Sequence, residues 1–326
     1  MTDRDQPTLL SQFNYYLGGL ASWWIGLGLQ SVLIAFLVTF ELQETPERIG
    51  IAQMSNMLPS LLLILYAGIV SDRYDCRDIA FRLHLLAFIP PMVIAAGIYF
   101  SYLTYELVIV YASLMSVLSA FNMTSRDALL NRVMTGDMQR AVSKATSAQF
   151  ISQISGFVIA GFASFIGSVP LLILQGVVMA IGGIFTYWIH PDKKKRQQAQ
   201  VMSKAKKPSR WKSMKEGFVV VGKHPLMRIV SLLNILVGLF FMGSLTVGVP
   251  IIVRDIYSGD STGISMSLMA FYGGIIAMSM ILTHAPPVKY IGRNITVALA
   301  FGSFLIILAS FEISFYIFIV LIFAWG

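Results

Sequence analysis

The sequence is poor in charged residues and contains a single cysteine. Only 12% of its 326 residues are charged and 56% are hydrophobic, whereas a soluble domain usually carries about 25% charged residues. This composition excludes an ordinary soluble domain and indicates a chain with many membrane-spanning helices. Because Cys76 is the only cysteine, no intramolecular disulfide can form.

Nucleotide-binding and metalloprotease motifs are missing as well. The sequence contains neither a Gly-x-x-x-x-Gly-Lys-Ser/Thr loop nor a His-Glu-x-x-His pair. The histidines are far apart in the sequence, and we expect them near helix ends at the membrane surface rather than in a metal site; they are His84, His190, His224 and His284. We therefore predict no enzymatic activity, no metal site and no cofactor.

Nine apolar stretches are long enough to cross a bilayer as helices, which takes about 20 residues. They run approximately over 15–40, 48–70, 79–100, 105–123, 146–166, 169–189, 226–252, 262–283 and 295–310. A tenth begins near Ser314 and reaches the last residue, Gly326. A helix that ended inside the membrane would leave carbonyl groups without hydrogen bonds. We therefore expect a truncated sequence; a half-helix buried in a larger assembly is the alternative.

The distribution of lysine and arginine predicts the orientation. All 24 basic residues except Arg48 and Arg254 lie in segments, with their adjoining helix ends, that share one side of the membrane. These segments are 1–14, 71–78, 124–145, 190–225 and 284–294. Basic loops stay in the cytoplasm, so we predict a cytoplasmic N-terminus in a bacterial inner membrane. Because these residues lie between spans, we expect no nucleic-acid partner.

The polar, lysine-rich segment 190–225 interrupts the series of spans. It predicts an N-terminal six-helix bundle over 1–189, a basic cytoplasmic linker over 190–225 and a partial C-terminal bundle over 226–326. Residues 285–294 form a second basic loop, 217 positions after the loop at 68–77 and at the equivalent point of the second half. Two bundles with matching loops indicate a structural repeat, as in many transporters.

The loop over residues 68–77 resembles a signature of the major facilitator superfamily, Gly-x-x-x-Asp-Arg-x-Gly-Arg-Arg/Lys. Gly68, Asp72, Arg73 and Arg77 match it, whereas positions 75 and 76 differ. The resemblance implies an all-α membrane protein with the two-bundle fold of this family, of whose twelve helices this chain has about nine and a half. It also implies that Asp72 helps to latch the two bundles together; a turn that only sets topology is the alternative.

Two further segments resemble branches of the same family. Arg126 and Ala128 match the Pro-x-Arg-x-Ala element of drug and siderophore exporters, also called transmembrane secretion effectors. Gly156 and Gly161 resemble the Gly-Pro-x-x-x-Gly element of proton-driven antiporters, with Phe157 in place of the proline. The resemblance therefore implies a gating set, which consists of Gly68, Asp72, Arg73, Arg77 and Arg126.

No charged residue lies near the middle of a complete predicted span, where proton carriers and charged cargo would need one. The spans contain uncharged polar residues instead, and those that we expect to line a cargo cavity are Gln30, Asn56, Gln149, Gln153 and Asn234. In the fifth span Gln149 and Gln153 lie one helical turn apart, on one face. Packing between helices is the alternative for each of them.

These features together predict a secondary active transporter that works by alternating access. We expect it to export small amphiphilic molecules, such as drugs, siderophores or related metabolites, with protons as the coupling ion. It would be a monomer whose partners are its cargo and the membrane lipids. Two alternatives stay open: a translocator of lipids or lysophospholipids, and a membrane scaffold subunit that transports nothing.

The latch offers a first test. Asp72→Asn removes the carboxylate but keeps the side chain's shape, so we expect normal membrane insertion and slower transport at matched expression. Unchanged transport would reduce Asp72 to a residue that only sets topology.

Overall fold

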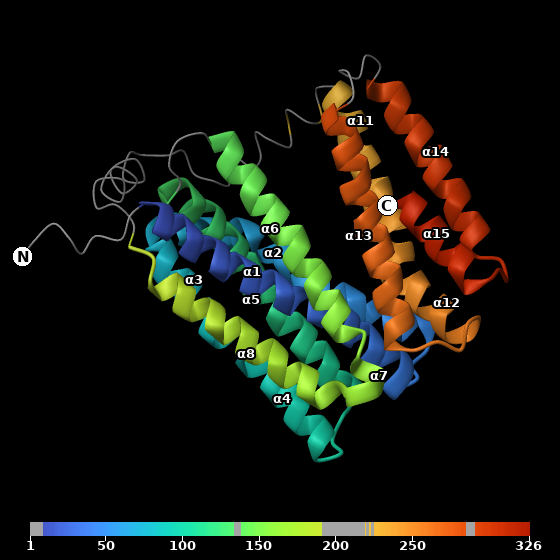
Figure 1. Cartoon of the computed structure of the whole chain (residues 1–326), viewed down its shortest axis with the longest axis horizontal. Helices are drawn as coiled ribbons and strands as arrows, with labels where there is room; N and C mark the ends of the chain where they lie inside the picture. The colour runs from blue at the N-terminus through green and yellow to red at the C-terminus, as the bar shows by residue number, and fades with distance from the viewer. Residues whose placement is uncertain (1–8, 134–137, 191–218, 220–221, 223–224, 285–290) are drawn as a thin grey trace, which may run out of the picture.

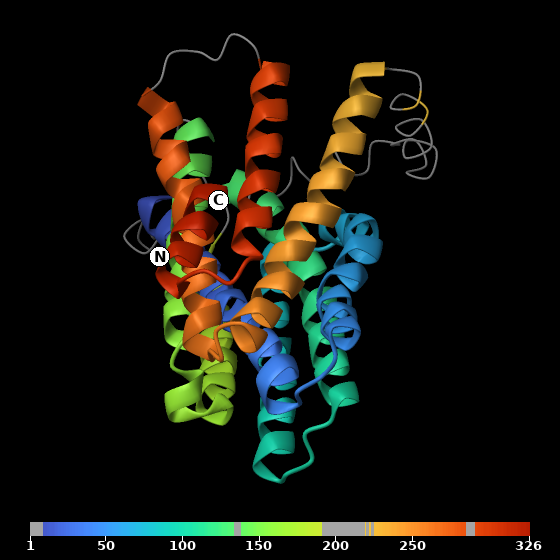
Figure 2. The same cartoon turned by 90° about the vertical axis from the view of Figure 1, so that its right-hand side faces the viewer.

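The computed structural model describes residues 9–133, 138–190, 219, 222, 225–284 and 291–326. Within these residues the only regular elements are helices (Figure 1). The helices of the first half, from α1 to α8, gather on one side of the molecule, and α11, α13, α14 and α15 gather on the other (Figure 1). In Figure 2 the long helices run roughly along one common direction, as expected for a bundle in a bilayer.

In its described residues the first half has eight α-helices, and a π-helical end extends the first of them. Their bounds are α1 Leu9–Phe36, η1 Leu37–Glu41, α2 Pro46–Arg73, α3 Cys76–Leu86, α4 Ile89–Tyr99, α5 Tyr105–Val133, α6 Met138–Ala160, α7 Ala163–Ile166 and α8 Ser168–Tyr187. We call the end where α2 ends and α3 begins the basic end of the molecule. The end where η1 ends and α2 begins is the opposite end.

The second half begins with a long helix that is partly π-helical. Its elements are α11 Pro225–Leu236, η2 Val237–Met242, η3 Ser244–Gly248, α12 Val249–Asp255, α13 Ser261–His284, α14 Ile291–Ala309 and α15 Phe315–Trp325. The π-helical turns at 237–248 surround Gly243 and adjoin Pro250, which cannot donate a backbone hydrogen bond. Such wide turns often mark functional positions.

The predicted membrane spans are confirmed in the described part of the chain. Nine helical stretches are long and apolar enough to cross a bilayer, and α15 is a shorter apolar helix. Leucine, isoleucine and phenylalanine side chains cover much of the outer surface; on α2, Leu61 is 69% exposed and Leu62 is 68% exposed. Exposed apolar surfaces of this kind are typical of contact with lipid or with further protein.

Two helices continue beyond their predicted ends. Helix α5 runs to Val133 rather than stopping near 123, and α2 includes Asp72 and Arg73 in its last turn. Residues 124–133 contain neither proline nor glycine, so nothing in the sequence breaks the helix where the hydrophobic run ends. Hydropathy marks the edge of the bilayer, not the end of a helix. Arg126 therefore lies within a helix, not in a loop.

Two proline sites show how interrupted backbone hydrogen bonds are handled. Between α3 and α4 the helix restarts at Ile89, and Pro90 follows in the first turn, where a missing N–H costs little. Pro59 lies inside α2, and the neighbouring Ser60 N–H donates to Ser116 Oγ of α5 at 3.0 Å. A side chain from the next helix thus replaces a bond that water cannot supply in a membrane.

Helix α1 is the centre of the first half and packs directly on α6 and α8. Its contact with α6 depends on two glycines. A Cβ added at Gly156 would lie 2.8 Å from Gly28 Cα and 2.9 Å from Leu29 N, and it would also collide with Ile25 O. Small residues let helix backbones approach this closely, which is how helices commonly associate in membranes.

The glycine contact predicts a stability difference between two equal substitutions. Gly156→Ala places a methyl group against the backbone of α1, so we expect a loss of about 1–3 kcal/mol and a lower unfolding temperature in detergent. Gly50→Ala in α2 is the control, because an added Cβ there has nothing within 4 Å. Equal unfolding temperatures for the two variants would contradict this description of the α1–α6 contact.

Candidate functional site

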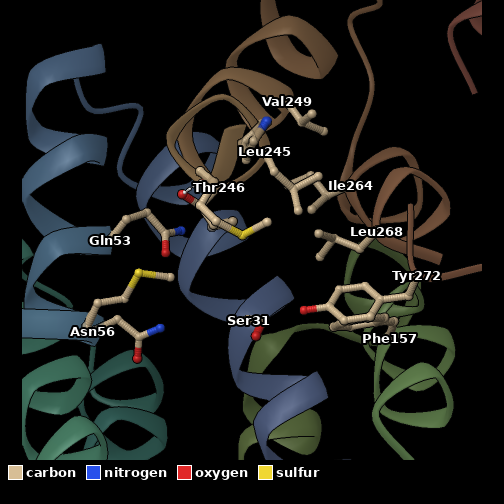
Figure 3. Close-up of a pocket in the computed structure, with 14 residues that line it drawn as sticks. Ser31, Gln53, Asn56, Phe157, Leu245, Thr246, Val249, Ile264, Leu268 and Tyr272 are labelled. Carbon is tan, nitrogen blue, oxygen red and sulfur yellow. Dashed lines mark hydrogen bonds between the residues drawn. The ribbon is translucent and has the colours of Figure 1, made fainter. Parts of the chain in front are cut away.

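A cavity of about 100 Å³ lies between the two halves. Three helices of the first half and two segments of the second line it (Figure 3). The lining residues are Ser31, Ala35, Gln53, Asn56, Met57, Phe157, Met242, Leu245, Thr246, Val249, Pro250, Ile264, Leu268 and Tyr272. None of them carries a formal charge. Most of the wall is apolar, and its polar groups are a few hydroxyls and amides.

The π-helical turns supply a large part of the second half's wall. Met242, Leu245 and Thr246 come from η2 and η3, and Val249 follows directly in α12. Thr246 Oγ1 donates to Met242 O at 2.8 Å, so the hydroxyl satisfies a backbone carbonyl of the widened helix. Its oxygen remains available as an acceptor at the wall of the cavity.

The structure brings three of the five predicted cavity residues to this site. Asn56 lines the cavity, and Gln30 Nε2 donates to Asn56 Oδ1 at 2.7 Å from behind it. Gln153 Nε2 donates to the hydroxyl of Tyr272, another lining residue, at 3.3 Å. Gln149 lies half-buried on α6 and is not among the lining residues described. The side chain of Asn234 lies outside the described residues.

Besides Ser31, which directly follows Gln30, sequence reasoning missed three lining side chains that carry polar groups. Tyr272 and Thr246 lie in spans that gave no periodic polar signal, and Gln53 precedes Asn56 by three positions. This i, i+3 spacing of two amides on α2 was a usable signal, because it places both on one helix face. No pattern within its own helix marks Tyr272, since its role depends on Gln153 of α6.

Direct hydrogen bonds join the two halves at the opposite end. Ser164 N donates to Ser261 Oγ at 2.9 Å, the two hydroxyl oxygens lie 2.8 Å apart, and Ser261 N donates to Ser164 Oγ at 3.2 Å. The hydroxyls of Ser261 and Thr262 also donate to Gly161 O at 3.1 and 3.0 Å. These contacts link the end of α6 and the start of α7 to the start of α13.

Arg254 adds a second link at the same end. Its Nη1 donates to Glu44 O at 2.9 Å and to Thr39 O at 3.4 Å, both in the segment that follows α1. The guanidinium also pairs with the neighbouring Asp255, with Nε 2.6 Å from Oδ1. An arginine thus ties the end of α12 to the end of η1. We call this arginine link and the serine contacts together the seal.

The cavity lies on the basic-end side of the seal. Along α13, Ser261 belongs to the seal, and Ile264, Leu268 and Tyr272 follow it toward the basic end. On α6 the same order holds, because Phe157 precedes the seal residue Gly161 by one turn. The two halves therefore close the cavity at the opposite end.

The predicted gating residues at the basic end contact only their own half, so far as they are described. Arg77 Nη2 donates to Tyr187 O of α8 at 2.5 Å, and the Arg77 guanidinium lies 5.3 Å from that tyrosine ring. Ser71 Oγ donates to the carbonyl of Gly68 at 3.0 Å within α2. The side chains of Asp72 and Arg73 lie outside the described residues.

Arg126 is largely buried inside the first half. Its guanidinium lies 5.4 Å from the ring of Trp24 on α1 and 3.6 Å from the carboxylate of Asp127. A cation over an indole face is a favourable pair when both groups are partly desolvated. The structure therefore places Arg126 between α5 and α1.

Asp75, one of the positions that differ from the family signature, has a structural role that the sequence did not indicate. Its side chain accepts from Arg77 N at 3.1 Å and so caps the first turn of α3. The same Oδ1 lies 3.5 Å from Nη1 of Arg132, at the end of α5. A carboxylate here ties α3 to α5, which the glycine of the signature could not do.

The expectation that the histidines lie at the membrane surface is wrong for His84. The side chain is only 3% exposed, and its Nδ1 lies 2.9 Å from Met179 O of α8. The ring of Trp23 meets the imidazole edge-on, with 5.1 Å between the ring centres. The imidazole fills a gap between α1, α3 and α8. The polar residues that precede His84 in α3 gave no sign in the sequence that this side chain is buried.

Residues Gly259 to Gly263 have the spacing Gly-x-Ser-x-Gly, which is an exception to the expected absence of enzyme motifs. In hydrolases this spacing places a nucleophile between a strand and a helix. Here Ser261 follows a loop, and its hydroxyl is bound in the seal. His284, at the other end of α13, lies about 35 Å away at 1.5 Å per residue. The segment is a structural contact.

The comparisons with known proteins agree with this architecture. The family model described as Major Facilitator Superfamily matches residues 16–326. A search of curated protein sequences gives no match. Among solved structures, the crystal structure of nucleoside transporter NupG aligns with a TM-score of 0.69 and 16% sequence identity over 98% of this chain and 78% of that chain. At that identity the likeness concerns the fold. This multi-pass membrane protein belongs to the major facilitator superfamily and is a transporter, not an enzyme.

Proposed function

We propose that this protein is a secondary active transporter that exports small amphiphilic molecules by alternating access. The observation that carries the proposal is the uncharged cavity between the halves, closed at one end by hydrogen bonds that cross from one half to the other. Rocking of the two halves would break the seal and expose the cavity at the opposite end. The division into residues 1–189, 190–225 and 226–326 belongs to this proposal.

The direction of transport rests on the distribution of charge. Basic residues gather at the basic end, which supports a cytoplasmic position for that end and for the N-terminus in a bacterial inner membrane. The cavity lies on this side of the seal and would load cargo from the cytoplasm. Release after the seal opens would then export the cargo.

The cargo class follows from the wall of the cavity. Apolar side chains favour an apolar body, and the amides and hydroxyls favour a few polar groups on it. The volume of about 100 Å³ is below the roughly 300–1,000 Å³ of sites that enclose drug-sized ligands. The cavity must therefore widen to enclose any cargo of this size, and the preference for drugs, siderophores or related metabolites over lipids rests on the family resemblance.

Three further features stay predictions. Proton antiport needs a titratable group, and the lining residues of the cavity include none with a carboxylate. The latch assigned to Asp72 depends on contacts of a side chain that is not described. A monomer is the simplest state for a transporter whose cavity forms within one chain.

Export can be measured with chloramphenicol, a neutral amphiphile, as the probe. Cells that express the full native protein should accumulate less radiolabelled chloramphenicol than cells with an empty vector, and a proton uncoupler should abolish the difference if protons drive export. A membrane scaffold would change accumulation in neither case. Equal accumulation of chloramphenicol and of a panel of other neutral amphiphiles would contradict the exporter proposal.

The seal gives a sharper prediction. Ser164 Oγ and Ser261 Oγ lie 2.8 Å apart, so cysteines at both positions should form a disulfide when oxidised. In a Cys76→Ser background, we expect Ser164→Cys/Ser261→Cys to lose at least tenfold in export on oxidation and to recover it on reduction. Either single cysteine alone serves as the control. Export that continues through the oxidised protein would show that this end need not open.

A further inference from the structure

A chain of four hydrogen-bonded side chains reaches the cavity from the core of the first half. Tyr111 of α5 donates from its hydroxyl to Gln175 Oε1 of α8 at 2.7 Å. Gln175 Nε2 then donates to Gln30 Oε1 of α1 at 3.5 Å, and Gln30 Nε2 donates to Asn56 Oδ1 of α2 at 2.7 Å. Four helices contribute one residue each, and the chain ends at the wall of the cavity.

Tyr111 fixes the direction in which this chain donates. An amide can be turned over without changing its shape, so its donor and acceptor ends are assigned from the partners around it. A phenol has one proton, and Tyr111 is only 2% exposed, so that proton must reach an acceptor inside the protein. In the described part of the chain its hydroxyl bonds to Gln175, which must therefore present oxygen to it.

The remaining orientations follow from the first. With its oxygen toward Tyr111, Gln175 directs its N–H groups toward Gln30. Gln30 therefore accepts this hydrogen bond through its own side-chain oxygen. Gln30 then presents N–H to Asn56. Gln175 and Gln30 are 0% and 2% exposed, so no bulk solvent competes for these groups. The oxygen of Asn56 is thus held by the protein, and its amide nitrogen faces the cavity (Figure 3).

Tyr272 presents a second donor. Its hydroxyl accepts from Gln153 Nε2 at 3.3 Å, which leaves its own proton for another partner. The hydroxyl points into the cavity from the wall opposite Asn56 (Figure 3). Ser31, between them, donates its proton to Leu27 O at 2.9 Å. Asn56 and Tyr272 therefore both offer hydrogen to a bound molecule, whereas the hydroxyl oxygens of Ser31 and Thr246 can accept and the amide of Gln53 can do both.

We propose that the cavity selects neutral molecules that carry hydrogen-bond acceptors such as carbonyl groups, and that Tyr111, Gln175 and Gln30 are positioning residues that set this preference. A cation would find no carboxylate among the lining residues to neutralise its charge, which is costly in a site shielded from water. A carbonyl oxygen satisfies Asn56 and Tyr272 together. This inference rests on the proposed transport function, whose cavity it specifies.

Ligand-induced thermal shifts of the purified full-length protein test the proposal. The probes are chloramphenicol, which is neutral and carries an amide carbonyl and a nitro group, and tetraphenylphosphonium, a cation without acceptors. Dissociation constants follow from the dependence of the unfolding temperature on probe concentration. We expect wild type to bind chloramphenicol at least tenfold more tightly than tetraphenylphosphonium.

Two variants separate the positioning role from a purely structural one. Tyr111→Phe removes the proton that fixes the chain, so Asn56 can turn its oxygen to the cavity. We expect chloramphenicol binding to weaken about fivefold to tenfold, the value of one hydrogen bond, with tetraphenylphosphonium binding unchanged or stronger. Tyr66→Phe, which removes a hydroxyl from a 57% exposed tyrosine on α2, should match wild type.

Asn56→Asp tests the donor directly, because it keeps the shape and replaces the free N–H with a carboxylate oxygen. We expect the preference to reverse, with tetraphenylphosphonium bound more tightly than chloramphenicol. This variant lies at the half-buried edge of the cavity, so it gives a result even if Tyr111→Phe fails to fold.

Several results would overturn the proposal. They are a wild type that prefers the cation or binds neither probe, a Tyr111→Phe variant with wild-type selectivity, and an Asn56→Asp variant whose preference does not move.

Failure of the proposed transport function would give a different pattern of results. If the selectivity holds but oxidation of the Ser164→Cys/Ser261→Cys variant leaves export intact, alternating access at the seal fails and the cargo class stands. If the seal controls export but the cation is preferred, only the cargo class fails.

Discussion

The absence of water inside a bilayer is the constraint on which the structure depends. Each polar group in a span must find a partner in the protein or line a space that cargo and water can enter. Ser116 of α5 therefore accepts from the backbone beside Pro59. Tyr111 starts a chain of amides that ends at the cavity. Other polar groups, such as the amide nitrogen of Asn56, face the space between the two halves.

The same constraint explains how the seal can be firm and still open. Its serine and arginine contacts bond directly to groups of the other half at the opposite end. A typical hydrogen bond contributes only about 0.5–1.5 kcal/mol net, so the few bonds of the seal total a few kcal/mol. Cargo or ion binding can shift an equilibrium of that size. The α1–α6 contact, by contrast, brings backbones together at Gly28 and Gly156 and keeps the first half rigid.

The sequence predicted the spans and the two-bundle fold because long apolar runs match the thickness of the bilayer and basic loops mark its cytoplasmic side. It predicted less of the site, since partners across helices leave no periodic signal. Gln30 and Asn56 stood out as polar residues in apolar runs, but only the fold shows that one orients the other. Tyr272 and the buried His84 depend on residues more than 90 positions away, Gln153 and Met179. No local pattern could have found them.

Motion of the two halves at the seal is the central claim, and a distance measurement tests it most directly. Tyr102 and Glu312 are exposed positions at the opposite end of each half. Spin labels on cysteines introduced at these positions in a Cys76→Ser background would give their separation by double electron–electron resonance. The account predicts two distances in lipid nanodiscs, with the longer one gaining population when cargo is supplied. A single distance that stays the same while the protein transports would contradict it.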